Sequence, residues 1–267
     1  MERLYNEKLV ISGERLEVYR YSCYLKEGKE GNNKEGRKGK GGQGATEENK
    51  VINRKATLYR ARNKIIRLIS SNQDLNTFIT LTYKENFKDL TKSKEHLKLF
   101  FKKLQKDYQN LKYVYVLEYQ ERGAIHYHFL CNIEFDIKFA KSNNKKNQEQ
   151  KELEKYFSKR YWSNRGFADI RNLKDEGNTN VAKYVSVYLV EDLMELDLKG
   201  SKCYGYSRNL NKPIEKRLDN KQDIKEEIDT LTEVYNVGYT SNYELVYTDK
   251  KGNTRSAKVT YLDCKLK

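Results

Sequence analysis

Residues 112–133 read KYVYVLEYQERGAIHYHFLCNI, and this stretch decides the fold expected for the chain. It contains two runs rich in β-branched and aromatic residues, Lys112 to Tyr119 and Ile125 to Ile133, joined by a polar segment that includes Gly123. Two such runs separated by a short loop with a glycine predict a β-hairpin. The middle of the chain is therefore expected to hold an antiparallel sheet.

The second run carries His126 and His128, two of the 3 histidines in the chain. Residues two apart on a strand point to the same face, so the two imidazoles are expected to project together. With a loop of residues 121–123, Glu118 falls directly opposite His126, at a Cβ distance of about 5 Å. Two nitrogens and one oxygen suit Mg²⁺ or Mn²⁺ acting on a phosphate as a Lewis acid. Glu121 is the alternative ligand for a shifted register, and an inert histidine pair is the alternative to a metal site.

The elements around the hairpin are mixed helices and strands. Residues 3–25 alternate in the manner of strands, residues 47–71 repeat apolar side chains at helical spacing, and residues 77–83 form a β-branched run. Further helices are expected at residues 95–106, 180–193 and 221–234, and further strands at 167–170, 244–247 and 257–262. Consecutive strands that pair through a hairpin favour an α+β fold with a central antiparallel sheet flanked by helices.

Charge and composition indicate the class of partner. Lys and Arg number 53 against 38 Asp and Glu, a net charge of +15, which favours a nucleic acid and leaves an anionic membrane surface as the alternative. No stretch approaches the roughly 20 apolar residues of a membrane span, and the first residues lack the apolar core of a signal peptide. The 4 cysteines are far apart in the sequence, so a reducing cytoplasm is the expected location.

A second motif contains two tyrosines, Tyr184 and Tyr188. On the helix expected over residues 180–193 they lie one turn apart and face the same way. A tyrosine hydroxyl can attack phosphorus once the scissile phosphate is polarised. Core packing is the ordinary role of such a pair, since the chain has 22 tyrosines.

Taken together and in this order, the motifs resemble those of the rolling-circle replication initiators of small plasmids and single-stranded DNA phages. These belong to the HUH endonuclease superfamily, in the group related to filamentous-phage gene II protein. The resemblance covers residues 47–213. It is carried by Phe78-Ile79-Thr80-Leu81-Thr82, by Arg122-Gly123-Ala124-Ile125-His126-Tyr127-His128, by Tyr184-Val185-x-x-Tyr188, and by Lys202-Cys203-Tyr204 followed by Ser207-Arg208 and Lys212-Pro213.

The resemblance implies a nickase that cuts one strand of single-stranded or hairpin origin DNA and remains linked to its 5′-phosphate. His126, His128 and Glu118 become the expected metal ligands, and Tyr184 and Tyr188 the expected nucleophiles. Arg122 and Lys183 are the expected DNA-binding residues. The freed 3′-hydroxyl would serve a host DNA polymerase, and a host helicase would separate the strands because the chain has no nucleotide-binding motif.

The implied organisation has four parts: N-terminal strands (1–25), a disordered Gly/Lys-rich linker (26–50), an HUH endonuclease domain (51–213) and a C-terminal α/β extension (214–267). The chain departs from the family at Val187 and Val190, where lysine is usual, and Lys183 or Lys174 is the expected substitute. A mobilisation relaxase and a single-strand transposase share this chemistry. A DNA-binding protein with impaired catalysis and a small-molecule metalloenzyme are the alternatives of other classes.

Overall fold

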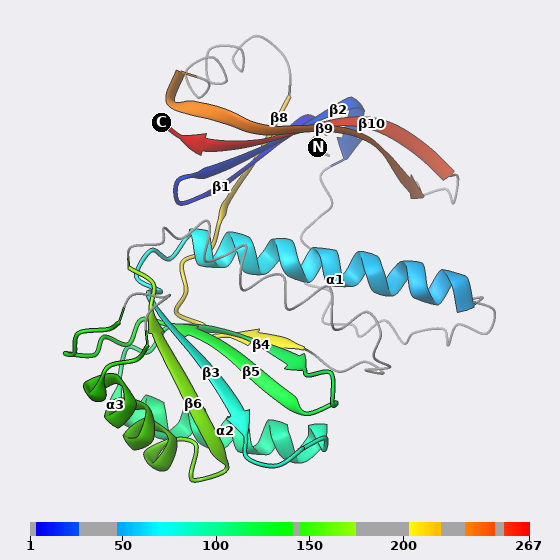
Figure 1. Cartoon of the computed structure of the whole chain (residues 1–267). Helices are drawn as coiled ribbons and strands as arrows, with labels where there is room; N and C mark the ends of the chain where they lie inside the picture. The colour runs from blue at the N-terminus through cyan, green and yellow to red at the C-terminus, as the bar shows by residue number, and fades with distance from the viewer. Residues whose placement is uncertain (1–3, 27–46, 141–144, 175–202, 220–232, 249–253) are drawn as a thin grey trace. The chain divides into compact units, whose positions relative to one another are not determined.

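The computed structural model describes residues 4–26, 47–140, 145–174, 203–219, 233–248 and 254–267 (Figure 1). The chain divides into two compact units, which are described separately. The central unit comprises residues 46–211, and the terminal unit comprises residues 1–45 together with residues 212–267. Each unit contains one five-stranded sheet.

The sheet of the central unit has the strand order β6-β3-β5-β4-β7, and each neighbouring pair is antiparallel. Strand β5 lies in the middle of this order, and every one of its residues is buried. The expected α+β fold with a central antiparallel sheet is therefore confirmed. The strands are β3 (Thr77–Tyr83), β4 (Tyr113–Tyr119), β5 (Ile125–Cys131), β6 (Gly166–Asn172) and β7 (Tyr204–Tyr206).

Three helices accompany this sheet: α1 (Glu47–Ser70), α2 (Leu90–Asp107) and α3 (Gln148–Arg160). Figure 1 shows α2 and α3 on one side of the sheet and α1 on the other. Helix α2 begins at Asp89, whose carboxylate accepts a hydrogen bond from the Lys92 N–H at 3.0 Å, and α3 begins at Asn147 in the same manner. The helix expected over residues 47–71 is present as α1, whereas the one expected at 180–193 lies outside the described residues.

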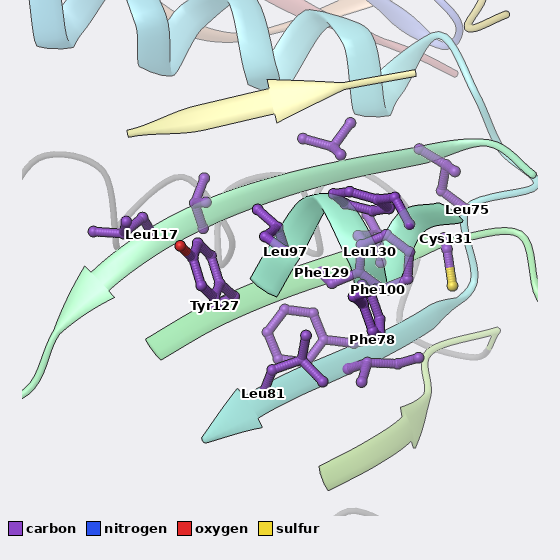
Figure 2. Close-up of a cluster of buried hydrophobic side chains, with 14 of the residues drawn as sticks. Leu75, Phe78, Leu81, Leu97, Phe100, Leu117, Tyr127, Phe129, Leu130 and Cys131 are labelled. Carbon is purple, nitrogen blue, oxygen red and sulfur yellow. The ribbon is translucent and has the colours of Figure 1, made fainter. Parts of the chain in front are cut away.

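The core of the central unit forms between α2 and the sheet (Figure 2). Tyr127 and Phe129 of β5 point towards α2: the Tyr127 hydroxyl lies 2.6 Å from Ser93 Oγ, and the Phe129 ring packs edge-on at 5.6 Å against Phe100. Because side chains alternate along a strand, His126 and His128 consequently lie on the opposite face of the sheet. Packing on one face thus fixes which face carries the histidines.

The terminal unit joins segments from both sides of the central unit in the sequence. Its sheet has the order β8-β1-β2-β10-β9, and β10 pairs antiparallel with β2. A small apolar cluster of Leu9, Leu16, Val18 and Cys264 is buried on one face. The strands are β1 (Leu4–Ser12), β2 (Arg15–Lys26), β8 (Ile214–Leu218), β9 (Tyr235–Thr248) and β10 (Thr254–Leu266).

Several elements are longer than the sequence predicts. Helix α2 starts five residues before the expected 95, and β9 and β10 extend well beyond the expected 244–247 and 257–262. Residues 27–46, most of the expected linker, and residues 220–232, most of the expected last helix, lie outside the described residues. In the described part of the chain, no helix is long and apolar enough to cross a membrane.

Candidate functional site

The hairpin between β4 and β5 positions the candidate site. Its loop closes with hydrogen bonds from the Gln120 N–H to the Ala124 oxygen at 2.9 Å and from the Gly123 N–H to the Gln120 oxygen at 2.6 Å. Gly123 has a φ of 79°, a left-handed conformation that glycine adopts without strain. This turn pairs Glu118 with His126 across the two strands, which is the register expected from the sequence.

Strand β3 completes the floor of the site from the other side of β5. Thr82 pairs with His126 and Thr80 with His128, so the two threonines share a face with the two histidines. Both imidazoles are buried in spite of their polarity, with 6% and 5% of their surface exposed. A polar strip thus crosses three adjacent strands of an otherwise apolar sheet.

His128 is held on three sides. Its Nε2 atom contacts Glu118 Oε2 directly, in a very short hydrogen bond. Its Nδ1 atom shares a hydrogen bond with Thr80 Oγ1 at 3.2 Å, and its ring stacks on Phe78 at 5.6 Å with an interplanar angle of 12°. These contacts leave the imidazole a single orientation.

His126 differs from its neighbour. Its Nε2 atom is buried, and no described residue forms a hydrogen bond with it. Burial lowers the pKa of His126, and the charges of His128 and Arg122 lower it further, while the Glu118 carboxylate has the opposite effect. The imidazole is thereby favoured in its neutral form, which is the form that binds metal ions. A buried ring nitrogen without a partner is rare and calls for a ligand.

The donor atoms of the site fit a divalent cation. His128 Nε2 and Glu118 Oε2 are already in contact, and the orphaned Nε2 of His126 belongs to the residue paired with Glu118. Among the described residues, however, no group of three or more His, Cys, Asp or Glu side chains is arranged to hold a metal ion. Glu118 and His128 are instead hydrogen bonded to each other, through the same two atoms that would coordinate a cation.

The other expected site residues fall in different places. Glu121, the alternative ligand, is exposed in the hairpin loop, and Arg122 beside it donates a hydrogen bond to Gln120 Oε1 at 3.1 Å. Lys88 lies next to this loop, since a Cβ added at Gly123 would be 3.2 Å from its side chain. The expected nucleophiles Tyr184 and Tyr188, with Lys183, lie outside the described residues.

Thr80 and Phe78 contact His128, and no role in the site was expected for either from the sequence. Both belong to the Phe78-Ile79-Thr80-Leu81-Thr82 run, in which alternate residues share a face. The available signal was this alternation, together with the expectation that the run pairs with the histidine strand. The pairing itself depends on long-range contacts, which local sequence does not specify.

Comparison with known proteins identifies the region that carries the site. Searches of curated proteins and of solved structures find no match. Residues 76–192 match the family model described as replication-associated protein ORF2/gene II protein. The matched region includes Glu118, His126 and His128 as well as Tyr184 and Tyr188. The region 76–192 is therefore a replication-associated domain of the ORF2/gene II type, which agrees with the resemblance to rolling-circle replication initiators.

Proposed function

We propose that this protein initiates rolling-circle replication by nicking one DNA strand at an origin and joining itself to the 5′-phosphate. The observation that carries the proposal is the buried, unpartnered Nε2 of His126 beside the His128–Glu118 pair. An inert histidine pair in a sheet would have both rings satisfied by hydrogen bonds, as His128 is. The match of residues 76–192 to a replication-associated family supports the same function.

Glu118, His126 and His128 would hold Mg²⁺ or Mn²⁺. When bound there, such a cation acts as a Lewis acid on a phosphate oxygen of the DNA. Thr80 keeps the His128 ring in place through Nδ1, which leaves Nε2 for coordination. The buried floor around both rings excludes water from the ligand side.

The proposed nucleophile is the hydroxyl of Tyr184 or Tyr188. Its oxygen forms a bond to phosphorus while the bond between phosphorus and the 3′-oxygen breaks, and the 3′-oxygen takes up a proton. The products are a 5′-phosphotyrosine and a free 3′-hydroxyl that a host polymerase can extend. One phosphodiester is exchanged for another, so the reaction needs no nucleoside triphosphate. A host helicase would unwind the duplex ahead.

Arg122 is proposed to contact the DNA from the hairpin loop, where its side chain is exposed. Lys88 lies beside the same loop and adds a second positive charge. Lys183 is proposed as a DNA-binding residue from its position next to Tyr184 in the sequence. Phosphate contacts of this kind hold the strand in register without reading its bases.

A labelling experiment tests the proposal. Labelled single-stranded oligonucleotides that tile the DNA flanking the gene are incubated with the protein and Mn²⁺ and separated on a denaturing gel. We expect a protease-sensitive protein–DNA adduct that disappears with EDTA, in His126→Ala and in the double variant Tyr184→Phe/Tyr188→Phe. Each single tyrosine variant shows which hydroxyl attacks.

Tyr156→Phe is the matched control, because Tyr156 is an exposed tyrosine of α3. It should form the adduct at the wild-type rate. Oligonucleotides that are bound but never joined to the protein, with any tile and with either cation, would show that nicking is not its function. Such a result would leave the DNA-binding alternative, with Val187 and Val190 in place of the usual lysines. Adduct formation only on a transfer origin or a transposon end would instead identify a relaxase or transposase.

A further inference from the structure

One face of the terminal sheet is lined by tyrosines. The strand registers place Tyr21 beside Val259 and Tyr243, and Tyr19 beside Tyr261, on the same side of three neighbouring strands. Tyr5 of β1 packs against Tyr21 at 6.0 Å. We call this surface the tyrosine face; its tyrosines are Tyr5, Tyr19, Tyr21, Tyr239, Tyr243 and Tyr261.

The rings of the tyrosine face touch one another across the strands. The Tyr19 and Tyr261 centroids are 5.0 Å apart, and Tyr239 continues the row at 6.3 Å from Tyr261. Burial raises the pKa of Tyr21 and of Tyr261, so these hydroxyls stay protonated at neutral pH. The surface therefore presents aromatic rings with uncharged hydroxyl groups, a combination suited to stacking and hydrogen bonding together.

The opposite face of the same sheet contains the apolar cluster of Leu9, Leu16, Val18 and Cys264. A sheet that packs one face on a core leaves the other face available to solvent or to a ligand. Tyr239 and Tyr243 fit this division, because 58% and 44% of their surfaces are exposed. Solvent-facing strand positions ordinarily carry small polar or charged residues, and aromatic rings there indicate a binding surface.

Positive side chains lie among the rings. Lys8 lies over the Tyr19 ring, with Nζ 5.9 Å from its centroid, and the Arg217 guanidinium lies 5.8 Å from the Tyr5 centroid. Lys265 pairs with Arg15 at the end of the same face and is exposed. Cations in contact with aromatic rings are typical of surfaces that bind single-stranded nucleic acid.

The carboxylates of this face are already engaged within the sheet. Arg15 binds Asp263 at 2.7 Å, and Glu17 accepts hydrogen bonds from the hydroxyls of Tyr19 and Tyr261 at 3.1 and 3.2 Å. Glu215 binds Lys8 at 3.0 Å. The acidic groups thus hold the rings and the cations in position, and among the described residues the cations of the face outnumber its carboxylates. This balance favours a polyanion as the ligand.

We propose that the tyrosine face binds single-stranded nucleic acid, with bases stacked on Tyr239 and Tyr243 and phosphates near Lys8 and Arg217. Stacking on flat rings needs no particular base, so binding is expected to be tolerant of sequence. This site lies outside the residues that match the replication-associated family, and it does not depend on the proposed nicking reaction. It would give the terminal unit a role in holding the displaced or flanking strand.

The test uses the full chain in EDTA, so that nicking does not contribute. Binding of fluorescein-labelled oligothymidylate, about 20 nucleotides long so that it spans one binding site, is followed by anisotropy. We expect Tyr239→Ala/Tyr243→Ala to raise Kd about tenfold through loss of stacking. Tyr239→Phe/Tyr243→Phe, which keeps the rings, should bind as the wild type does. Thermal unfolding of each variant checks that these exposed substitutions leave the fold intact.

Thr240→Ala/Val246→Ala is the matched control on the same strand, because its exposed side chains lie on the opposite face. Cross-linking with an oligonucleotide that carries 5-iododeoxyuridine gives a direct second readout, and we expect cross-links at Tyr239 or Tyr243. Wild-type affinity in the alanine pair, without a cross-link in β9, would overturn the proposal. So would a loss of binding to anionic lipid vesicles in that pair with oligonucleotide binding unchanged. Neither result bears on the covalent adduct, which is measured separately with Mn²⁺.

Discussion

Thr80 illustrates how one hydroxyl group can prepare a histidine for its role. It bonds to Nδ1 of His128, while Phe78 stacks against the same ring. With Nδ1 engaged, coordination or hydrogen bonding must use Nε2, the atom that contacts Glu118. Residues that orient a ligand in this way typically matter almost as much as the ligand itself. Thr80 is therefore a positioning residue under the proposed function.

Replacing Thr80 with valine tests this role. Valine has nearly the same shape and favours strands, so the fold should be kept while the hydrogen bond to His128 is lost. We expect the Mn²⁺ concentration for half-maximal nicking to rise about tenfold, with a smaller change at saturating Mn²⁺. Thr91→Val, at an exposed position on α2, serves as the control. An unchanged Mn²⁺ dependence would show that Thr80 does not position the ring.

Gly166 marks a close approach between two backbones. A Cβ at this position would lie 1.8 Å from the Thr82 oxygen and 2.7 Å from the Lys84 nitrogen, so β6 could not keep its distance from β3. We expect Gly166→Ala to lower the free energy of unfolding by about 3 kcal/mol. Urea unfolding followed by the fluorescence of Trp162, which is buried and hydrogen bonded to the Thr82 oxygen at 3.2 Å, measures the change.

Gly238→Ala provides the comparison, because the added Cβ would make only an ordinary contact of 3.6 Å with the Asp263 oxygen. Its stability should stay close to that of the wild type. If the two alanine variants were equally stable, the crowding at Gly166 would have no energetic consequence.

At the scale of single elements, the β4–β5 hairpin is the part that the sequence predicts best. A glycine in the loop and two alternating runs are local signals, and together they give the observed Glu118–His126 register. The strands β7 and β8 were not predicted. They are short edge strands of three and five residues with mixed composition, and only pairing with β4 and β1 makes them strands.

Lys146 connects the start of α3 to the edge of the sheet. Its Nζ atom binds Glu154 at 2.6 Å and Asp169 of β6 at 2.5 Å. Burial on its own would raise the pKa of Asp169, but the hydrogen bond and charge of Lys146, with Arg171 nearby, lower it overall. The folded pKa of Asp169 is therefore below the unfolded value. Its contribution to stability is present above the unfolded pKa, about 3.9, and is lost as the pH falls through the folded pKa.

We accordingly expect Asp169→Asn to be less stable than the wild type at neutral pH by at most about 1 kcal/mol, since the groups are partly exposed. The difference should shrink as the pH is lowered from about 6 to about 3. Thermal unfolding at a series of pH values measures both quantities. Asp136→Asn, at an exposed carboxylate, is the control. A difference that stays constant or grows on acidification would contradict the ion pair as its cause.

At the scale of the whole molecule, the terminal unit is assembled from two separate parts of the sequence. Strands β1 and β2 precede the central unit, and β8, β9 and β10 follow it. The strand character of residues 3–25 was predicted from their alternation. Their pairing with β10 was not, because the choice of a distant partner depends on packing, and a local pattern contains no information about it. The positions of Tyr184 and Tyr188 stay a prediction from the sequence.

Deletion of residues 212–267 tests the dependence of the two ends on each other. The deletion removes β8, β9 and β10, and it leaves β1 and β2 as a two-stranded hairpin, which is marginally stable at best. We expect peptides from residues 4–26 to lose protection in hydrogen–deuterium exchange, while peptides from β3 and β5 keep theirs. Retained protection in residues 4–26 would show that the hairpin is stable without its partners.

The strand order of the terminal sheet also sets a timetable for synthesis on the ribosome. Strand β2 is made early, but its neighbour β10 emerges only after the whole central unit has been translated. During this interval the nascent chain presents an open strand edge, which can pair wrongly with other chains. Early folding of the central unit shortens the effective tether between the two ends. Slow or faulty folding there would consequently prolong the exposure of β2, so mutations far from this strand can cause aggregation that begins with it.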